Sequence, residues 1–223
     1  MATNHYWILR HAESLANVEG IIVSKSEIGT QQYGLSPRGR EGLPAKLAAQ
    51  VAAFMRTSPS VDATANLGAA DLGAADLGAD TLIVSSDFLR ARETAAIAAS
   101  VLKAAPPRLE PALRERDFGS LDGKSDREYP SVWALDAAHS ASYPNGIESP
   151  AAVRTRLVAL IKRMEEEESG RTILLVSHGD TLQILQTCFA GLSAHRHREL
   201  PHLDKGELRY LGRWQAPETL GSS

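Results

Sequence analysis

Residues 172–177 read Thr-Ile-Leu-Leu-Val-Ser, and this stretch decides the fold class. The run is mostly β-branched or aliphatic and does not alternate with polar residues, which is typical of a parallel strand covered on both faces. Residues 6–9, Tyr-Trp-Ile-Leu, and residues 81–85, Thr-Leu-Ile-Val-Ser, have the same character. Residues 206–214 are expected to supply a final edge strand.

Helical patterns alternate with these runs. Ser36 followed by Pro37 predicts an N-cap and the first turn of a helix that runs towards Met55. Residues 87–102 carry apolar residues at helical spacing. Strands that alternate with helices predict a three-layer α/β fold, with a mostly parallel sheet and helices on both faces.

Two more helices are expected in the second half. Ser149 and Pro150 predict the start of one, and Asp180 with Gln183 predicts a capping box for another that runs to about Ala190. The apolar stripe of the first is formed by Val153, Leu157, Leu160, Ile161 and Met164.

Two segments do not fit this alternation. Residues 66–80 contain Leu-Gly-Ala-Ala-Asp repeats with a period of five, which matches neither helix nor strand, so we expect a low-complexity surface loop. The alternative is that its leucines dock into a partner. Residues 118–148 are rich in Gly, Pro and aromatic residues, and we expect them to form a lid or subdomain inserted into a single domain of residues 1–223.

Composition excludes several classes of protein. The apolar fraction of 43% and the charged fraction of 23% are ordinary for a globular chain. Cys188 is the single cysteine, so an intrachain disulfide is impossible and a cysteine-based zinc site is not expected. The net charge of −3 does not favour a nucleic-acid partner. The sequence contains no apolar run of membrane-spanning length and no secretory signal pattern, so we expect a cytoplasmic protein without membrane contact.

Cationic and imidazole groups follow three of the predicted strands. Arg10 and His11 end the first, Arg90 comes soon after the second, and His178 with Gly179 ends the third. Ligands of open α/β sheets bind at the carboxyl ends of the strands, so these side chains are expected at one rim. Arginine matches phosphate oxygens with its planar fork, and neutral imidazole is a nucleophile.

The set therefore predicts a phosphoryl pocket that needs no metal and no cofactor. Glu115 is the best candidate for the acid that protonates a departing alcohol. Glu13 could compete for that role, but it could equally pair with a neighbouring base.

Other polar residues have more ordinary interpretations. Asp180 is expected to cap a helix, and Arg92 to be solvated. The cluster at residues 195–198, His-Arg-His-Arg, is expected to be a mobile surface turn, with an anion or metal contact as the alternative. Trp133 and Tyr143 fit a subdomain core as well as a substrate wall. Three further histidines are expected to be ordinary surface or core residues, namely His5, His139 and His202.

Five stretches, taken in order, resemble the motifs of the histidine phosphatase superfamily, in the branch that includes phosphoglycerate mutase. They are Arg-His-Ala-Glu-Ser-Leu-Ala-Asn at residues 10–17, Ser-Ser-Asp-Phe-Leu-Arg-Ala-Arg-Glu-Thr at 85–94, residues 113–123 around Glu115, Pro-Asn-Gly-Ile-Glu-Ser at 144–149 and Ser-His-Gly-Asp at 177–180. The whole chain is also similar to eukaryotic phosphoglycerate-mutase-like proteins.

The resemblance implies a fold and a set of roles. His11 would be the nucleophile that becomes phosphohistidine, and Glu115 the proton donor. Arg10, Arg90 and His178 would hold the phosphoryl oxygens, with assistance from Asn17 and the backbone at Gly179. Ala12 departs from the family's usual glycine, and we expect the methyl group to be tolerated.

The resemblance does not by itself decide between two reactions, the hydrolysis of a phosphate ester and the mutase-type transfer of a phosphoryl group. Phosphoglycerate mutases carry a Trp-Arg-Arg element, and here the matching stretch is Trp-Ala-Leu at residues 133–135. A site without these arginines should bind a compact polyanion poorly. We therefore expect hydrolysis of a small phosphomonoester, with mutase-type transfer and a non-catalytic binding module as the alternatives. The substrate and the oligomeric state stay open.

Overall fold

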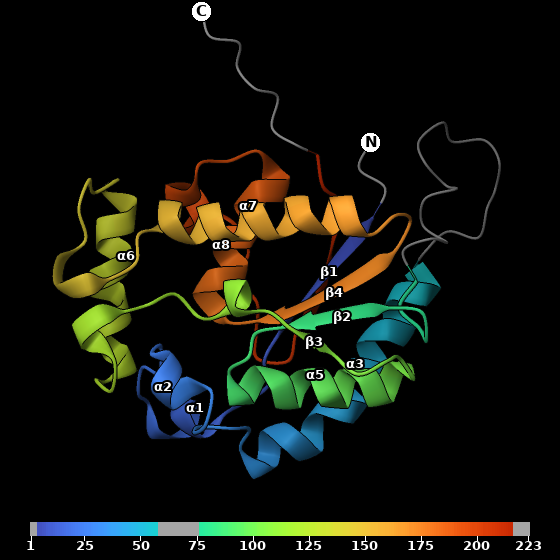
Figure 1. Cartoon of the computed structure of the whole chain (residues 1–223). Coiled ribbons are helices and arrows are strands. Elements are labelled where there is room, and N and C mark those ends of the chain that lie inside the picture. Colours follow the sequence, from blue (N-terminus) through green and yellow to red (C-terminus); the bar gives the residue numbers. More distant parts are fainter. Residues whose placement is uncertain (1–3, 58–75, 216–223) are drawn as a thin grey trace, which may run out of the picture.

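A five-stranded sheet runs through the centre of the computed structural model, which describes residues 4–57 and 76–215 (Figure 1). Its order is β3-β2-β4-β1-β5, in which the first four strands are parallel and β5 pairs antiparallel with β1. The mostly parallel sheet and the edge position of the last strand are therefore confirmed. The strands are β1 His5–Arg10, β2 Leu82–Ser85, β3 Arg108–Leu109, β4 Thr172–Ser177 and β5 Leu208–Arg213.

Helices cover both faces of this sheet, with α7 and α8 above it and α3 and α5 below it in Figure 1. The α-helices are α1 Leu15–Glu19, α2 Ser26–Gly29, α3 Pro37–Thr57, α5 Leu89–Leu102, α6 Tyr129–Ala137, α7 Pro150–Glu167 and α8 Gly179–Ala190. The 3₁₀ helices are η2 Pro111–Leu113, η3 Gly119–Leu121, η4 Asp126–Glu128, η5 Pro144–Gly146 and η6 Ala194–Glu199.

Apolar and polar residues do not alternate along β4, and the structure shows why. The strand lies between β2 and β1, and all six of its residues are buried. Ile173 and Leu175 pack towards α7 and α8, whereas Leu174 and Val176 pack towards α3 and α5. Both faces of the strand therefore need apolar side chains, which removes the period of two.

The starts of α3 and α7 were predicted correctly. The Ser36 hydroxyl accepts a hydrogen bond from the backbone N–H of Gly39 at 2.9 Å, and the Ser149 hydroxyl accepts one from Ala152 at 3.1 Å. Each serine satisfies a donor that the first helical turn leaves unpaired. The predicted apolar stripe of α7 is buried along its whole length.

The capping box predicted at the start of α8 is wrong. The N-cap is His178, and Asp180 lies in the first turn with its carboxylate accepting from Trp133 Nε1 at 3.1 Å. Gln183 instead donates to the carbonyl of Leu200 at 2.8 Å. The Asp180 carboxylate makes tertiary contacts in place of the local bond, while its charge still stabilises the helix N-terminus.

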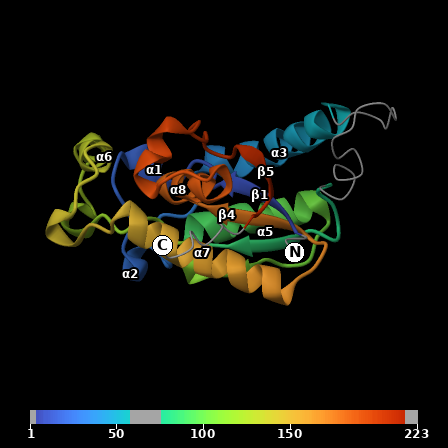
Figure 2. The same ribbon diagram turned by 90° about the horizontal axis from the view of Figure 1, so that it is seen from above.

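Residues 118–148 form a set of short helices with a small apolar cluster of their own. Phe118, Val132 and Ile147 pack there with Ile22 from the loop after α1. Figures 1 and 2 both place α6 at one end of the molecule, the end towards which the strand arrows point. This segment therefore adds a wall beyond the carboxyl edge of the sheet.

Most of the five-residue repeat lies outside the described residues, which resume at residue 76. Leu77 is 7% exposed and packs in the cluster that contains Trp7 and Leu174. The described end of the repeat is thus anchored in the core of this chain. No helix in the described ranges is long and apolar enough to cross a membrane.

Candidate active site

His11 follows β1 directly and is 3% exposed. Its Nδ1 lies 2.7 Å from the carbonyl oxygen of Ala12, which can only accept, so Nδ1 carries the proton. Its Nε2 accepts a hydrogen bond from Arg90 Nε at 3.2 Å. The imidazole is therefore fixed in the tautomer whose Nε2 presents a lone pair.

The charge state of His11 follows from the same surroundings. Burial, and then the positive charges of Arg90 and Arg10, hold the pKa of His11 well below its usual value. The ring is thus neutral, which is the nucleophilic form of imidazole.

Arg10 and Arg90 each have one buried N–H group that has no hydrogen-bond partner among the described residues. Arg10 Nη1 donates to the carbonyl of Leu203 at 2.7 Å, and Arg90 Nη2 donates to the carbonyl of Val23 at 2.9 Å. Among the described residues, however, Arg10 Nε and Arg90 Nη1 have no hydrogen-bond partner. Buried donors are nearly always satisfied, so these two N–H groups indicate a site for an oxygen-rich anion.

His178 completes the buried part of this group. It is fully buried, its ring centroid lies 5.2 Å from that of His11, and its Nε2 lies 2.9 Å from the hydroxyl of Ser86. Its Nδ1 has no partner within the described chain. Burial and the charge of Arg90 lower its pKa well below the usual value, so this imidazole is also neutral.

Asn17 and Gly179 both line the cavity in front of His11. The Asn17 side-chain oxygen accepts from the backbone N–H and the hydroxyl of Ser14, each at 3.1 Å, so its amide N–H groups are the donors left for a ligand. A Cβ at Gly179 would lie 3.3 Å from the Arg10 guanidinium. Glycine at this position therefore lets the N-terminus of α8 approach the arginine closely.

Glu115 lies between η2 and η3 and faces the same cavity. Its Oε1 accepts hydrogen bonds from the backbone N–H of Arg116 at 3.0 Å and from the N–H and hydroxyl of Thr181 at 3.3 and 3.2 Å. Burial, and then the negative charge of Asp180, raise the pKa of Glu115. A carboxyl group with a raised pKa holds its proton closer to neutral pH, as a general acid must.

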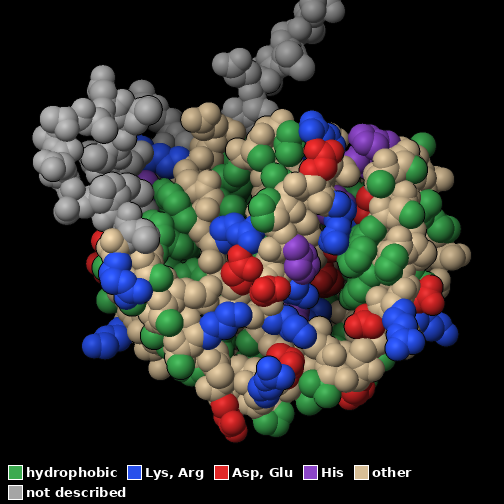
Figure 3. Space-filling view, turned by 180° about the vertical axis from the view of Figure 1, so that it is seen from behind, with side chains coloured by type: hydrophobic (Ala, Val, Ile, Leu, Met, Phe, Trp, Pro, Cys, Tyr) green, Lys and Arg blue, Asp and Glu red, His purple; other side chains and the backbone are tan. Residues whose placement is uncertain are grey.

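These residues share a cavity of about 240 Å³. On the face seen from behind, Lys, Arg, Asp, Glu and His side chains gather around a hollow near the middle of the molecule (Figure 3). The structure thus brings Arg10, His11, Asn17, Arg90, Glu115 and Gly179 together around one cavity, and the ring of His178 lies 5.2 Å from that of His11.

The same carboxylate also lines a second hollow. A cavity of about 490 Å³ is lined by Glu115 together with Lys25, Arg114 and Arg156. Glu115 is therefore shared by the lining of two cavities.

His202 was expected to be an ordinary histidine, and the structure places it at the surface, where it lines the cavity. Its Nε2 lies 2.7 Å from Arg10 Nη1, and its Nδ1 lies 3.1 Å from Gln183 Oε1. Burial and the charge of Arg10 lower the pKa of His202, so the neutral ring accepts from the arginine and donates to the glutamine. The sequence held no signal for this contact, because it depends on β5 running antiparallel to β1, which brings the loop before β5 past the carboxyl end of β1.

The prediction of a mobile surface turn at residues 195–198 is also wrong. His197 is fully buried within η6, and Arg198 stacks over the Trp133 ring with its central carbon 3.9 Å from the ring centroid. Arg198 also lies 3.7 Å from Asp180. The turn is fixed because it packs against α6 and α8.

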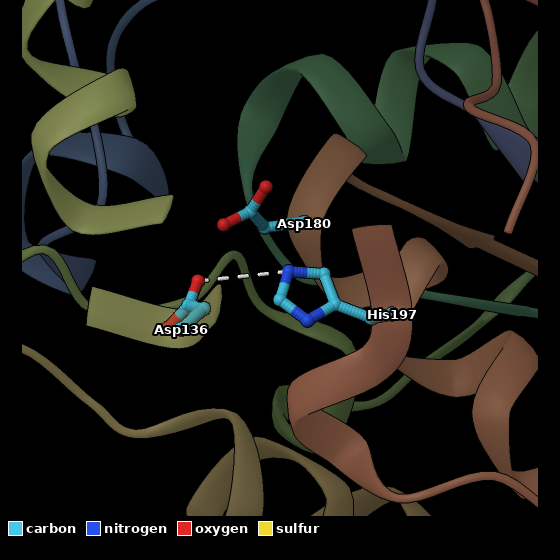
Figure 4. A group of neighbouring side chains, drawn as sticks. All are labelled: Asp136, Asp180 and His197. Atoms are coloured by element: carbon cyan, nitrogen blue, oxygen red, sulfur yellow. Dashed lines mark ion pairs between the residues drawn. The ribbon is translucent and has the colours of Figure 1, made fainter. Parts of the chain in front are cut away.

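One group among the described residues offers several metal-ligating atoms, namely Asp136, Asp180 and His197 (Figure 4). The cation between these carboxylates is Arg116, whose Nη1 and Nη2 bind the two oxygens of Asp136 at 2.7 and 2.9 Å. Arg116 Nη1 also lies 3.3 Å from Asp180. The guanidinium already neutralises the cluster, so we interpret it as a buried ion-pair network.

The remaining candidates have structural contacts. Glu13 accepts from the Ser36 hydroxyl at 2.8 Å, which agrees with a role outside the site. Arg92 donates to the carbonyl of Thr30 at 3.2 Å. His5 lies 2.6 Å from the hydroxyl of Tyr210, and His139 stacks on His195 with ring centroids 5.1 Å apart. The two aromatic candidates differ in their contacts. Trp133 lines the cavity, whereas the Tyr143 hydroxyl donates a hydrogen bond to Asp136.

Ala12 causes no backbone strain. The described non-glycine residues with positive φ are Tyr33, Lys103, His139 and Asn145, so Ala12 has an ordinary backbone conformation. Its N–H donates to the Thr94 hydroxyl at 3.1 Å. The expectation that alanine is tolerated at this position is confirmed.

Comparisons with known proteins identify the family of this chain. The sequence profile of the histidine phosphatase superfamily (branch 1) matches residues 62–216, which is more than half of the chain. A probable phosphoglycerate mutase, GpmB, from Photorhabdus laumondii is 35% identical over 126 residues, and its counterpart from Yersinia pestis is 32% identical over the same length. Each match covers 54% of this chain and 58% of the relative, so the chain spans little more than half of the length of these relatives.

Solved structures share the fold over nearly the whole chain. A mycobacterial glucosyl-3-phosphoglycerate phosphatase in complex with VO3 superposes with a TM-score of 0.66 at 21% identity, covering 96% of this chain and 99% of that one. The α-ribazole phosphatase from Shigella flexneri superposes with a TM-score of 0.64 at 22% identity, covering 95% of each chain. The three-layer fold predicted from the sequence is therefore confirmed.

Proposed function

Because the chain belongs to the histidine phosphatase superfamily, we propose that it hydrolyses small phosphomonoesters through a phosphohistidine on His11. The observation that carries this proposal is the neutral His11 with its Nε2 lone pair beside two buried arginine N–H groups that have no partner in the described chain. This arrangement offers a nucleophile and an anion site at the same point.

The first half of the reaction transfers the phosphoryl group to the protein. The phosphoryl oxygens take the free N–H groups of Arg10 and Arg90, and the lone pair of His11 Nε2 attacks phosphorus. The bond between phosphorus and the alcohol oxygen breaks, and the leaving oxygen takes the proton of Glu115. The ring of His178 lies 5.2 Å from that of His11, and we assign a phosphoryl oxygen to its Nδ1, which has no partner in the described chain.

The second half returns the enzyme to its starting state. The Glu115 carboxylate takes a proton from water, and the resulting hydroxide equivalent attacks phosphorus. The bond between phosphorus and His11 Nε2 breaks, and inorganic phosphate leaves. Nδ1 keeps its proton on the Ala12 carbonyl throughout, so the released ring has its lone pair on Nε2 again.

Phosphoryl transfer of the mutase type is the second candidate, because the curated relatives are named probable phosphoglycerate mutases. Hydrolysis is favoured by the lining of the cavity. Trp133 stands on its wall without the two arginines that would follow it in a mutase, and Asp126 and Asp180 add negative charge. A non-catalytic binding module is disfavoured because all the reacting groups are present.

The proposal is tested by phosphate release from a panel of sugar phosphates, phosphoglycerates, nucleotides, aryl phosphates and phosphopeptides. Wild-type protein should release phosphate from at least one small ester, and His11→Ala should release none. His139→Ala is the matched control, since His139 stacks on His195 and does not line the cavity. Release by His11→Ala at more than a few per cent of the wild-type rate would place the nucleophile elsewhere.

A further inference from the structure

The cavity in front of His11 has two halves of different chemistry. The half at the sheet edge is cationic and carries Arg10, Arg90 and the loop residue Lys205. The other half is lined by residues of the inserted segment 118–148, and each of those lining residues is aromatic or acidic: Phe118, Asp126, Tyr129 and Trp133. A monoester that places its phosphate in the first half must place its alcohol part against the second.

The aromatic rings of the second half form a continuous wall. The centroids of Phe118 and Tyr129 are 4.9 Å apart with an interplanar angle of 68°, and those of Tyr129 and Trp133 are 5.5 Å apart at 8°. The Trp133 ring is held further by its bond from Nε1 to Asp180. Ile21 and Val23 line the same cavity. Such a wall favours contact with an apolar or aromatic ring.

The charges of this half oppose an anionic alcohol part. Asp126 lines it, and the Asp180 carboxylate lies beside the same wall, 3.1 Å from Trp133 Nε1. The arginines nearby are already engaged, because Arg116 pairs with Asp136 and Asp180, and Arg198 pairs with Asp180 while it stacks on Trp133. A carboxylate on the alcohol part would therefore be desolvated near like charges.

The size of the cavity limits the alcohol part further. About 240 Å³ lies below the roughly 300–1,000 Å³ that drug-sized ligands occupy. A phosphoryl group together with one small ring fits this scale better than a sugar nucleotide or a peptide.

We propose that the substrate is the phosphomonoester of a compact apolar or aromatic alcohol that carries no negative charge. This inference rests on the proposed function of hydrolysis at His11. In this proposal the wall formed by Phe118, Tyr129 and Trp133 selects an apolar alcohol part. Asp126 excludes esters whose alcohol part carries a negative charge.

The charge requirement is tested with two esters of nearly equal shape, 4-carbamoylphenyl phosphate and 4-carboxyphenyl phosphate. The amide should be hydrolysed with a kcat/KM at least about tenfold higher than that of the carboxylate, since like charges a few ångströms apart repel strongly at a protein surface. The apolar requirement is tested with benzyl phosphate and glycerol 1-phosphate, which both release a primary alcohol. Benzyl phosphate should have the higher kcat/KM.

Two lysine variants separate the role of Asp126 from a general change of charge. Asp126→Lys should reduce or reverse the preference for the amide over the carboxylate. Glu128→Lys adds the same charge in the same short helix, η4; both residues are exposed, but Glu128 does not line the cavity. That control should keep the wild-type ratio of the two kcat/KM values.

The outcomes distinguish this inference from the proposed function. Equal kcat/KM for amide and carboxylate, with activity that still depends on His11, would overturn the inference and leave hydrolysis standing. The same shift in both lysine variants would also overturn the role of Asp126. Failure to release phosphate from any of the four esters, together with no phosphate release across the wider panel, would overturn both.

Discussion

Arg90 Nε donates a hydrogen bond at 3.2 Å to Nε2 of His11, the nitrogen that faces the cavity. In the free protein the arginine therefore occupies the lone pair that the proposed reaction needs. A bound phosphoryl group would offer Arg90 a charged acceptor in its place, and charge-assisted bonds are stronger than neutral ones. In the proposed reaction, substrate binding thus frees His11 Nε2 for attack on phosphorus.

The phosphoenzyme is the first prediction. Wild-type protein quenched during turnover of a radiolabelled ester should carry label that is stable in base and lost in acid, as a phosphoramidate is. His11→Ala should carry none, and His139→Ala should be labelled like the wild type. Label of the same stability on His11→Ala would contradict the assignment of the nucleophile.

Glu115→Gln should separate alkyl from aryl esters. Hydrolysis of an alkyl phosphate should slow by about 10²–10⁴, since its leaving oxygen needs the proton. An aryl phosphate should slow less, because its phenolate leaves more easily. Equal losses for the two esters would argue that Glu115 has a structural role only.

The pH profile gives an independent check on the same two groups. The pKa of Glu115 is raised, so the protonated acid persists to higher pH, and activity should fall as pH rises through that raised pKa. The pKa of His11 is lowered, so activity should persist below the ordinary histidine range on the acid side. Glu115→Gln should lack the loss at high pH when kcat is measured with an alkyl ester, and a profile identical to the wild type would contradict the assignment.

Mutase activity should be absent. Ala134 and Leu135 supply no cation after Trp133, so 3-phosphoglycerate should not be converted to 2-phosphoglycerate above background. An enolase-coupled assay with 2,3-bisphosphoglycerate present measures this directly. Hydrolysis of phenyl phosphate by the same preparation is the control for active protein, and robust mutase turnover would overturn the choice of hydrolysis.

The buried ion pair between Arg116 and Asp136 should be important for stability. Asp136→Asn should lower the free energy of unfolding by about 3–5 kcal/mol, because it leaves a buried guanidinium poorly compensated. Glu167→Gln, which breaks the partly exposed pair with Arg108, should cost only about 0–1 kcal/mol. Denaturant titration measures both. A double variant, Arg116→Met with Asp136→Leu, should lose less than Asp136→Asn, and a single-variant loss equal to that of the control would contradict the prediction.

Leu77 should be the residue through which the repeat affects stability. It is 7% exposed in the core cluster, so Leu77→Ala should cost about 2–5 kcal/mol of unfolding free energy. Leu109, which is 47% exposed, should cost about 0.5 kcal/mol or less when changed to alanine. Equal thermal midpoints for the two variants would show that Leu77 is not part of the core.

The sequence was sufficient for four of the five strands and for the cationic rim, because both depend on local patterns; β3, which has two residues, contains no apolar run that would mark it. An apolar run marks a buried strand, and the residues that follow it must lie at the sheet edge. The sequence was not sufficient to predict the contacts of Asp180. An aspartate near the start of a helix favours a capping role, but its actual partners, Trp133 and Arg116, lie far away in the chain. Nor did the sequence identify His202, since its contact with Arg10 depends on how the loop before β5 returns across the molecule.

The position of β4 between β2 and β1 has a consequence for the synthesis of the protein. β1 leaves the ribosome first, but both of its partners, β4 and β5, begin at or after residue 172. At 5–20 residues per second, the strand that precedes His11 waits roughly 10–30 s for a neighbouring strand. Until β4 is made, both edges of β1 therefore lack their partner strands, and the cavity in front of His11 is incomplete because Gly179 and Asp180 follow β4.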